Sequence, residues 1–152
     1  SQRTAAHRAY FFGREIQRWS EERKAPWLGR RPTYHDHDIG LPNCFLIAGM
    51  EAGHTIDMRA HTLLEAHWRD DADLADEAPL LRLADKASLD GKPLLEAAKT
   101  APIQALYEQY TQEAIDRSVF GSPTYFVDDD MFYGQDRLEL VARALKQPYA
   151  MG

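Results

Sequence analysis

The residues best suited to binding chemistry lie near the C-terminal end of the chain, where a serine and a proline open an apolar segment. Ser122-Pro123 precedes Thr124–Val127, whose β-branched and aromatic side chains are typical of a strand. Proline is tolerated at the first residue of a strand because no ladder N–H is lost there. With a cis bond, the backbone N–H and C=O of Ser122 would point outward, and a peptide-like thiol could pair with them as a short extra strand. An ordinary trans bond at a strand edge is the alternative.

Gln135-Asp136 forms a second group with binding chemistry. Asp136 and Glu139 have the spacing of a capping box, which predicts the start of a final helix. Free N–H groups at a helix start attract a carboxylate, and the Asp136 carboxylate can hold an ammonium group. Because an α-amino acid end carries both charges, this corner suits a γ-glutamyl group. Simple capping is the alternative.

Other reactive side chains indicate packing rather than catalysis. Cys44 is the one cysteine and lies among apolar neighbours, so we interpret it as a small buried residue. A single cysteine excludes an internal disulfide and favours a reducing compartment, and we expect a cytoplasmic location.

Metal binding is not expected either. Histidine spacing fits no zinc motif, and the acidic turn lacks the length and closing Glu of a calcium loop. The residues considered are His35-Asp36-His37-Asp38, His54, His61, His67 and Asp128-Asp129-Asp130.

Composition narrows the classes of function. The chain has 152 residues and a net charge of −6, so it has room for a core and lacks the clustered Lys and Arg of a nucleic-acid surface. No run approaches the roughly 18 apolar residues of a membrane span. Glycine-rich nucleotide loops and the Gly-x-Ser-x-Gly elbow are absent from the sequence.

The elements that position these residues are mostly helical. Apolar residues Ala5, Ala9, Phe12, Ile16 and Trp19 form one stripe of a long helix over 4–24. Further helices are predicted over 41–52, 55–68 with Thr55 as N-cap, 79–87, 93–99 and from 102 onward, with an acidic loop over 70–76. Strands at 124–127 and 131–133 follow, then a helix near the C-terminus. We therefore predict a helical domain over 1–118 and a ββα unit over 119–152.

A family resemblance rests on this second part. The segments Phe120-Gly121-Ser122-Pro123-Thr124-Tyr125-Phe126-Val127-Asp128 and Met131-Phe132-Tyr133-Gly134-Gln135-Asp136-Arg137-Leu138 resemble the C-terminal signature of the 2-hydroxychromene-2-carboxylate isomerases. These proteins group with the kappa-class glutathione transferases in the DsbA-like branch of the thioredoxin superfamily. Trp19, Trp68 and Pro79-Leu80-Leu81-Arg82-Leu83-Ala84 fit the family's helical insertion, and the resemblance extends from about His7 to the end.

The resemblance implies an α/β, mostly helical fold of DsbA-like thioredoxin type with a helical insertion. It also implies a cis-proline at Pro123 and glutathione as cofactor, with contacts from Ser122, Pro123, Gln135 and Asp136. A small aromatic carboxylate as substrate and a homodimer follow from it as well. Asp129 stands where members commonly have glycine, and because Asp tolerates a left-handed conformation, the turn is expected to survive.

The family's catalytic serine lies on an N-terminal βα turn. A βαβ unit takes about 30 residues, and the sequence has nothing like it before Thr4. We therefore expect that serine upstream, with only the helical domain and the C-terminal ββα half present here. No catalytic residue is assigned to this chain, which alone is expected to be inactive.

Three functions remain open at this stage. The first is glutathione-dependent isomerisation of a hydroxychromene-type carboxylate in aromatic degradation, or conjugation on the same scaffold. The second is DsbA-like thiol–disulfide exchange, which requires an upstream Cys-x-x-Cys. The third is an inactive binding fragment. Trp27, Tyr34 and Tyr133 are candidate pocket aromatics, with simple packing as the alternative.

Overall fold

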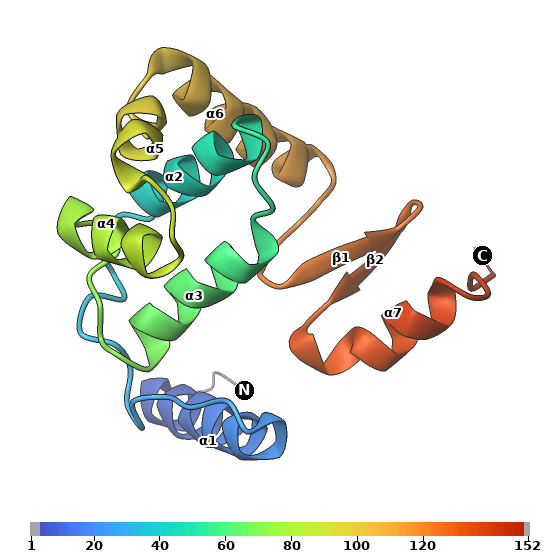
Figure 1. The fold of residues 1–152 in the computed structure, drawn as a ribbon. Coiled ribbons are helices and arrows are strands. Elements are labelled where there is room, and N and C mark those ends of the chain that lie inside the picture. Colours follow the sequence, from blue (N-terminus) through green and yellow to red (C-terminus); the bar gives the residue numbers. More distant parts are fainter. Residues whose placement is uncertain (1–3, 151–152) are drawn as a thin grey trace. The chain divides into compact units, whose positions relative to one another are not determined.

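The computed structural model describes residues 4–150 (Figure 1). These residues divide into two compact units, one that ends at Tyr107 and one that begins at Glu108. Helices make up the first unit, and a hairpin with a short helix makes up most of the second. The predicted boundary near Ser118 stays a prediction. In the described span, no helix is both long and apolar enough to cross a membrane.

The first helix, α1 (Ala5–Arg23), confirms the long helix predicted over 4–24. Thr4 caps it, since its Oγ1 accepts a hydrogen bond of 3.3 Å from the N–H of His7. The apolar stripe of α1 remains largely in solvent: Phe12 is 60% and Ile16 is 36% exposed.

The core of the first unit is built from the next five helices. Their bounds are α2 (Gly40–Glu51), α3 (Asp57–Trp68), α4 (Glu77–Lys86), α5 (Gly91–Ala98) and α6 (Ala101–Asp116), the last of which continues into the second unit. The strongly apolar α2 packs against α5, and α4 packs against α5 as well. Buried members of this core include Cys44, Phe45, Ile47, Leu80 and Leu95.

The helix starts of the first unit differ in whether a side chain caps them. Asp76 and Asp90 cap α4 and α5 by accepting hydrogen bonds of 3.3 Å from backbone N–H groups. The predicted Thr55 cap of α3 is wrong: α3 begins at Asp57, and its N-cap Ile56 makes no side-chain cap. Thr55 instead contributes its carbonyl, which accepts from Arg59 Nη1 at 2.7 Å.

The second unit carries the predicted hairpin. Strand β1 (Thr124–Val127) pairs antiparallel with β2 (Asp130–Tyr133), and these two strands are the whole sheet of the described residues. A short 3₁₀ turn, η1 (Gln135–Arg137), leads into α7 (Leu138–Ala144), which packs against β1. Among the described residues of this unit, Phe132 and Ala144 are buried.

The hairpin turn forms without glycine, as predicted, but the left-handed residue in it is Asp128 and not Asp129. Asp128 has φ of +53°, whereas Asp129 is not among the residues with positive φ. Asp and Asn adopt this left-handed region more readily than most residues. The left-handed position of the turn is therefore Asp128, one residue before Asp129, where the family resemblance led us to expect it.

Candidate functional site

The pairing register brings the two predicted binding segments of the second unit together. Thr124 lies opposite Tyr133, so the start of β1 faces the end of β2. Beyond this pair, the Gly134 N–H donates a hydrogen bond of 3.0 Å to the Pro123 carbonyl. Ser122-Pro123 and Gln135-Asp136 therefore meet at one corner of the hairpin. We call residues 121–123 and 134–136 the hairpin corner.

On the first side of the corner, the backbone of Ser122 is available to a ligand. The Ser122–Pro123 bond is cis. Ser122 is exposed, and within the described residues its N–H and C=O have no hydrogen-bond partner. The Thr124 hydroxyl donates to the Gly121 carbonyl at 2.6 Å and closes the bend that presents this backbone.

On the second side of the corner, Asp136 does not play the predicted capping role. The helix α7 begins at Leu138, and its N-cap Arg137 makes no side-chain cap, so the predicted capping box is wrong. The reason is the 3₁₀ turn Gln135–Arg137, which contains Asp136 and in which its carboxylate pairs with Arg137 Nη1 at 2.8 Å. That carboxylate stays 40% exposed and makes no capping hydrogen bond to α7.

Two glycines shape the corner. Gly134 has φ of +109° and ψ of 145°, and a Cβ there would lie 2.5 Å from Asp136 Oδ1. A Cβ on Gly121 would lie 2.6 Å from Cε2 of Tyr133, whose ring also packs on Phe120 with centroids 4.7 Å apart. The predicted pocket residue Tyr133 thus covers the backbone beside Ser122, an arrangement that sequence alone did not reveal.

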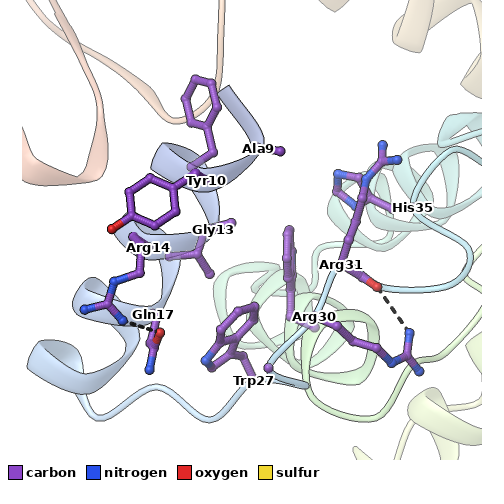
Figure 2. Close-up of a pocket in the computed structure, with 13 residues that line it drawn as sticks. Ala9, Tyr10, Gly13, Arg14, Gln17, Trp27, Arg30, Arg31 and His35 are labelled. Carbon is purple, nitrogen blue, oxygen red and sulfur yellow. Dashed lines mark hydrogen bonds between the residues drawn. The ribbon is translucent and has the colours of Figure 1, made fainter. Parts of the chain in front are cut away.

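A second concave feature lies in the first unit, between α1, the loop that follows it and the end of α3. Figure 2 shows this groove, whose volume is about 700 Å³. Its lining includes Phe12, Arg14, Ile16, Trp27, His35 and Trp68. Trp27 therefore lies where a pocket aromatic was predicted, whereas Tyr34 packs on His37 and is not part of the described lining.

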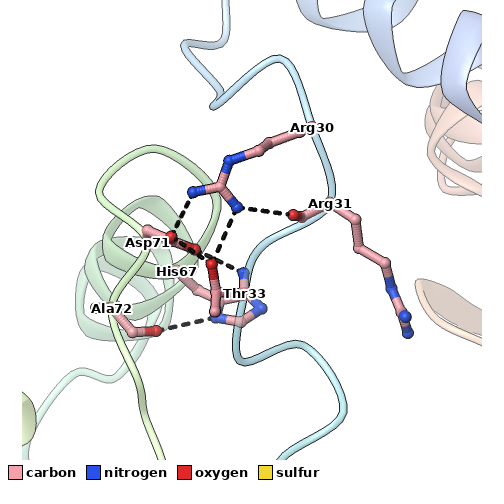
Figure 3. A network of polar contacts seen from close by, with 6 residues as sticks. All are labelled: Arg30, Arg31, Thr33, His67, Asp71 and Ala72. Carbon is pink, nitrogen blue, oxygen red and sulfur yellow. Dashed lines mark hydrogen bonds and ion pairs between the residues drawn. The ribbon is translucent and has the colours of Figure 1, made fainter.

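A polar network holds the loop beside the groove (Figure 3). Asp71 accepts from the Thr33 N–H at 2.7 Å, from the Thr33 hydroxyl at 2.7 Å and from Arg30 Nη2 at 2.6 Å. The Thr33 backbone hydrogen bond, together with Arg30 and the Thr33 hydroxyl, lowers the pKa of Asp71 to about 2. The Arg30 charge is therefore already paired.

The histidines predicted not to bind metal have other partners. His35 Nδ1 lies 3.0 Å from His67 Nε2, and His37 Nδ1 lies 3.0 Å from Asp73 Oδ2. Among residues 4–150 no group of three or more His, Cys, Asp or Glu is placed to hold an ion. Burial, with Arg31 and His67 nearby, lowers the pKa of His35 below its ordinary 6.5.

Cys44 lies in the core, as its apolar neighbours predicted. It is 5% exposed, and burial, with a smaller contribution from Asp38, raises the pKa of its thiol. A thiol in that setting is a poor nucleophile, because the thiolate is the reactive form.

Comparison with known proteins identifies relatives for most of this chain. A family model described as a DSBA-like thioredoxin domain matches residues 6–146. A 2-hydroxychromene-2-carboxylate isomerase from Pseudomonas sp. (strain C18) is 26% identical over 132 residues, which is 86% of this chain and 59% of that protein. The isomerase of the same name from Sphingobium xenophagum is 35% identical over 74 residues, which is 49% of this chain and 38% of that protein.

The fold has a counterpart among solved structures. A 2-hydroxychromene-2-carboxylate isomerase structure matches with a TM-score of 0.72 at 22% identity, over 91% of this chain and 66% of that one. This match shows that the two chains share a fold. Together with the family model over residues 6–146, it confirms the DsbA-like thioredoxin fold class expected from the sequence. The family model and the named relatives confirm the resemblance to the 2-hydroxychromene-2-carboxylate isomerases, whereas the grouping with the kappa-class glutathione transferases stays a prediction. The chain spans less than two thirds of the length of each of these relatives.

Proposed function

Because this chain belongs to the DSBA-like thioredoxin family, we propose that it serves a glutathione-dependent isomerisation of a 2-hydroxychromene-2-carboxylate type acid. The relatives bearing that name supply the reaction class. The hairpin corner supplies the groups that would hold glutathione. Catalytic residues are not assigned to the chain.

One observation carries the proposal: the Gly134 N–H bonds to the Pro123 carbonyl at 3.0 Å and joins the two predicted ligand segments. A tripeptide such as glutathione offers a peptide backbone at its centre and an α-amino acid at one end. The free N–H and C=O of Ser122 match the backbone, because an extended peptide can pair with them as a strand does. Pro123 holds this edge at the start of β1.

The other side of the corner matches the amino acid end. The Asp136 carboxylate would accept hydrogen bonds from the ammonium group, and the half-buried Gln135 amide would bond the carboxylate beside it. Arg137 pairs with Asp136 in the free protein at 2.8 Å. Because this pair is exposed, sharing Asp136 with a ligand ammonium costs little.

When bound, glutathione supplies a thiolate that adds reversibly to the conjugated double bond of the acid, which lets that bond rotate before the thiolate leaves. The chain's contribution is to fix the tripeptide at its central backbone and at its α-amino acid end, so that its sulfur has one orientation relative to the corner. Such positioning lowers the entropic part of the barrier. Thiol–disulfide exchange receives no support from Cys44, which is buried with a raised thiol pKa.

The test is calorimetric titration of the protein with glutathione. We expect saturable one-site binding, and the Asp136→Asn variant should weaken it about tenfold, the worth of one hydrogen bond to a charged group. Asp129→Asn, in the exposed hairpin turn, is the matched control and should bind as the native protein does. Absence of binding, or equal losses in both variants, would reject the proposal.

Substrate conversion is measured separately. Interconversion of 2-hydroxychromene-2-carboxylate and its open-chain isomer should be followed by absorbance with and without glutathione. We expect any conversion by a protein that contains this chain to depend on glutathione and to fall in the Asp136→Asn variant. Conversion of equal rate without glutathione would contradict the proposed role of the corner.

A further inference from the structure

Glutathione has a further charged group that the contacts of the proposed function do not engage. In that function Ser122 pairs with the central backbone of the tripeptide, and Asp136 holds the ammonium group of its γ-glutamyl end. The glycine residue at the other end carries a second carboxylate, which is ionised at neutral pH. The side chain that meets this carboxylate follows from the direction of the ligand and from the residues beside the hairpin corner.

The order of residues in the corner fixes the direction in which the tripeptide would run. The Asp136 carboxylate lies over Gly134, whose N–H bonds to the Pro123 carbonyl at 3.0 Å. A ligand that pairs with Ser122 and also reaches Asp136 therefore has its γ-glutamyl end on the Pro123 side. It runs antiparallel to the chain, and an antiparallel pair uses both the N–H and the C=O of one residue, which are free in Ser122. The glycine of the ligand then lies opposite Gly121.

Tyr133 is the side chain that covers Gly121. Side chains alternate between the two faces of a strand, so the buried Phe132 places its neighbour Tyr133 on the opposite, exposed face of β2. A Cβ on Gly121 would lie 3.1 Å from the Tyr133 hydroxyl oxygen, so this hydroxyl lies over the side-chain face of Gly121. Within residues 4–150 the Tyr133 hydroxyl has no hydrogen-bond partner.

The hydroxyl is within reach of the ligand's glycine carboxylate. Opposite residues of an antiparallel pair have Cβ positions about 4.5–5.5 Å apart, and one residue spans about 3.5 Å. The glycine carboxylate is terminal and can turn toward the hydroxyl, which stands directly over Gly121. A phenol donates one hydrogen bond, and a bond to an ionised carboxylate is stronger than a bond between neutral groups.

We propose that the Tyr133 hydroxyl binds the glycine carboxylate of glutathione and so adds a third anchor to the hairpin corner. The inference rests on the proposed function, because it takes glutathione as the ligand. With Asp136 at one end and Tyr133 at the other, the cysteinyl residue between them is held over Ser122. The site then selects the complete tripeptide over γ-glutamylcysteine, which has the same α-amino acid end and thiol but no glycine.

The experiment is calorimetric titration of the protein with glutathione and with γ-glutamylcysteine. The native protein should bind γ-glutamylcysteine about tenfold more weakly than glutathione, the worth of one hydrogen bond to a charged group. Tyr133→Phe removes the hydroxyl and keeps the ring over Gly121. It should lower the affinity for glutathione about tenfold and leave the affinity for γ-glutamylcysteine unchanged, so that the two peptides bind alike.

Two further variants serve as controls. Tyr110→Phe removes another exposed hydroxyl, on α6, and should keep the tenfold preference for glutathione. Asp136→Asn should lower the affinities for both peptides by the same factor, because both carry the γ-glutamyl end. A loss confined to glutathione in Tyr133→Phe would therefore not follow from a general change in the corner.

Two results would overturn the role of Tyr133 alone. One is equal affinity of the native protein for the two peptides, and the other is an equal loss of both affinities in Tyr133→Phe, which would make the residue a structural cover for Gly121. In either case both peptides still bind, and the proposed function stands. If neither peptide binds to the native protein, the proposed function fails and the role of Tyr133 fails with it.

Discussion

Replacing Gly134 by alanine should damage the hairpin corner in two ways at once. Its φ of +109° and ψ of 145° lie close to a backbone region that is essentially restricted to glycine, where another residue costs about 1–3 kcal/mol. The added Cβ would also lie 2.5 Å from Asp136 Oδ1, so the Asp136 side chain must rotate away. Loss of its exposed pair with Arg137 adds roughly 0–1 kcal/mol. We expect the opening free energy of the second unit to fall by about 2 kcal/mol. This value is the middle of the range for backbone strain, because the turn can relax.

The assay combines stability with binding. Native-state hydrogen exchange of the hairpin amides reports the opening free energy of the second unit, and calorimetry reports glutathione affinity. Displacement of Asp136 should lower the affinity for glutathione about tenfold, as loss of the carboxylate itself would. Gly53→Ala is the control: its φ is +79° but no atom lies within 4 Å of the new Cβ, so it carries backbone strain without touching the corner.

The outcome that would refute this reasoning is specific. If Gly134→Ala leaves hairpin exchange and glutathione affinity as they are in the native protein, the corner does not have the backbone described here. If Gly53→Ala lowers the affinity for glutathione as much as Gly134→Ala does, general destabilisation explains the lower affinity and the corner is not the binding site.

Two further predictions concern the first unit. Leu80→Ala, at a side chain with 0% exposure, should lower the free energy of unfolding by about 3 kcal/mol in urea titrations, whereas Leu64→Ala, 58% exposed, should change it by less than about 0.5 kcal/mol; equal effects would contradict the core assignment. The pKa of Asp71 is depressed to about 2 from 3.8, so its stabilisation is complete above 3.8 and is lost as pH falls toward 2. The Thr33 amide signal, bonded to Asp71, should titrate with a midpoint of about 2; a midpoint at 3.8 would mean that the network is absent in solution.

Much of the fold follows from local sequence signals. The strongly apolar segment over 41–52 predicts α2, because a helix apolar around most of its surface must be buried. The change to β-branched and aromatic residues at Thr124 predicts β1 within the correct bounds. The meeting of Ser122-Pro123 with Gln135-Asp136 also follows, since a tight hairpin brings its two ends together.

The missed features depend on contacts that spacing does not encode. Asp136 has a capping-box spacing, yet a 3₁₀ turn before Leu138 redirects its carboxylate to Arg137. Thr55 has a capping side chain, yet α3 starts two positions later, at Asp57. The groove was missed because Arg14, Trp27 and Trp68 come from three separate segments, and only the path of the chain after α1 places them together.

The most direct test of the account is to map glutathione onto the backbone by nuclear magnetic resonance. The account predicts that the amide signals of Ser122, Gln135 and Asp136 shift together with a single dissociation constant, while those of the groove, such as His35, stay in place. Shifts confined to residues outside the hairpin corner, or no shifts at saturating glutathione, would contradict it.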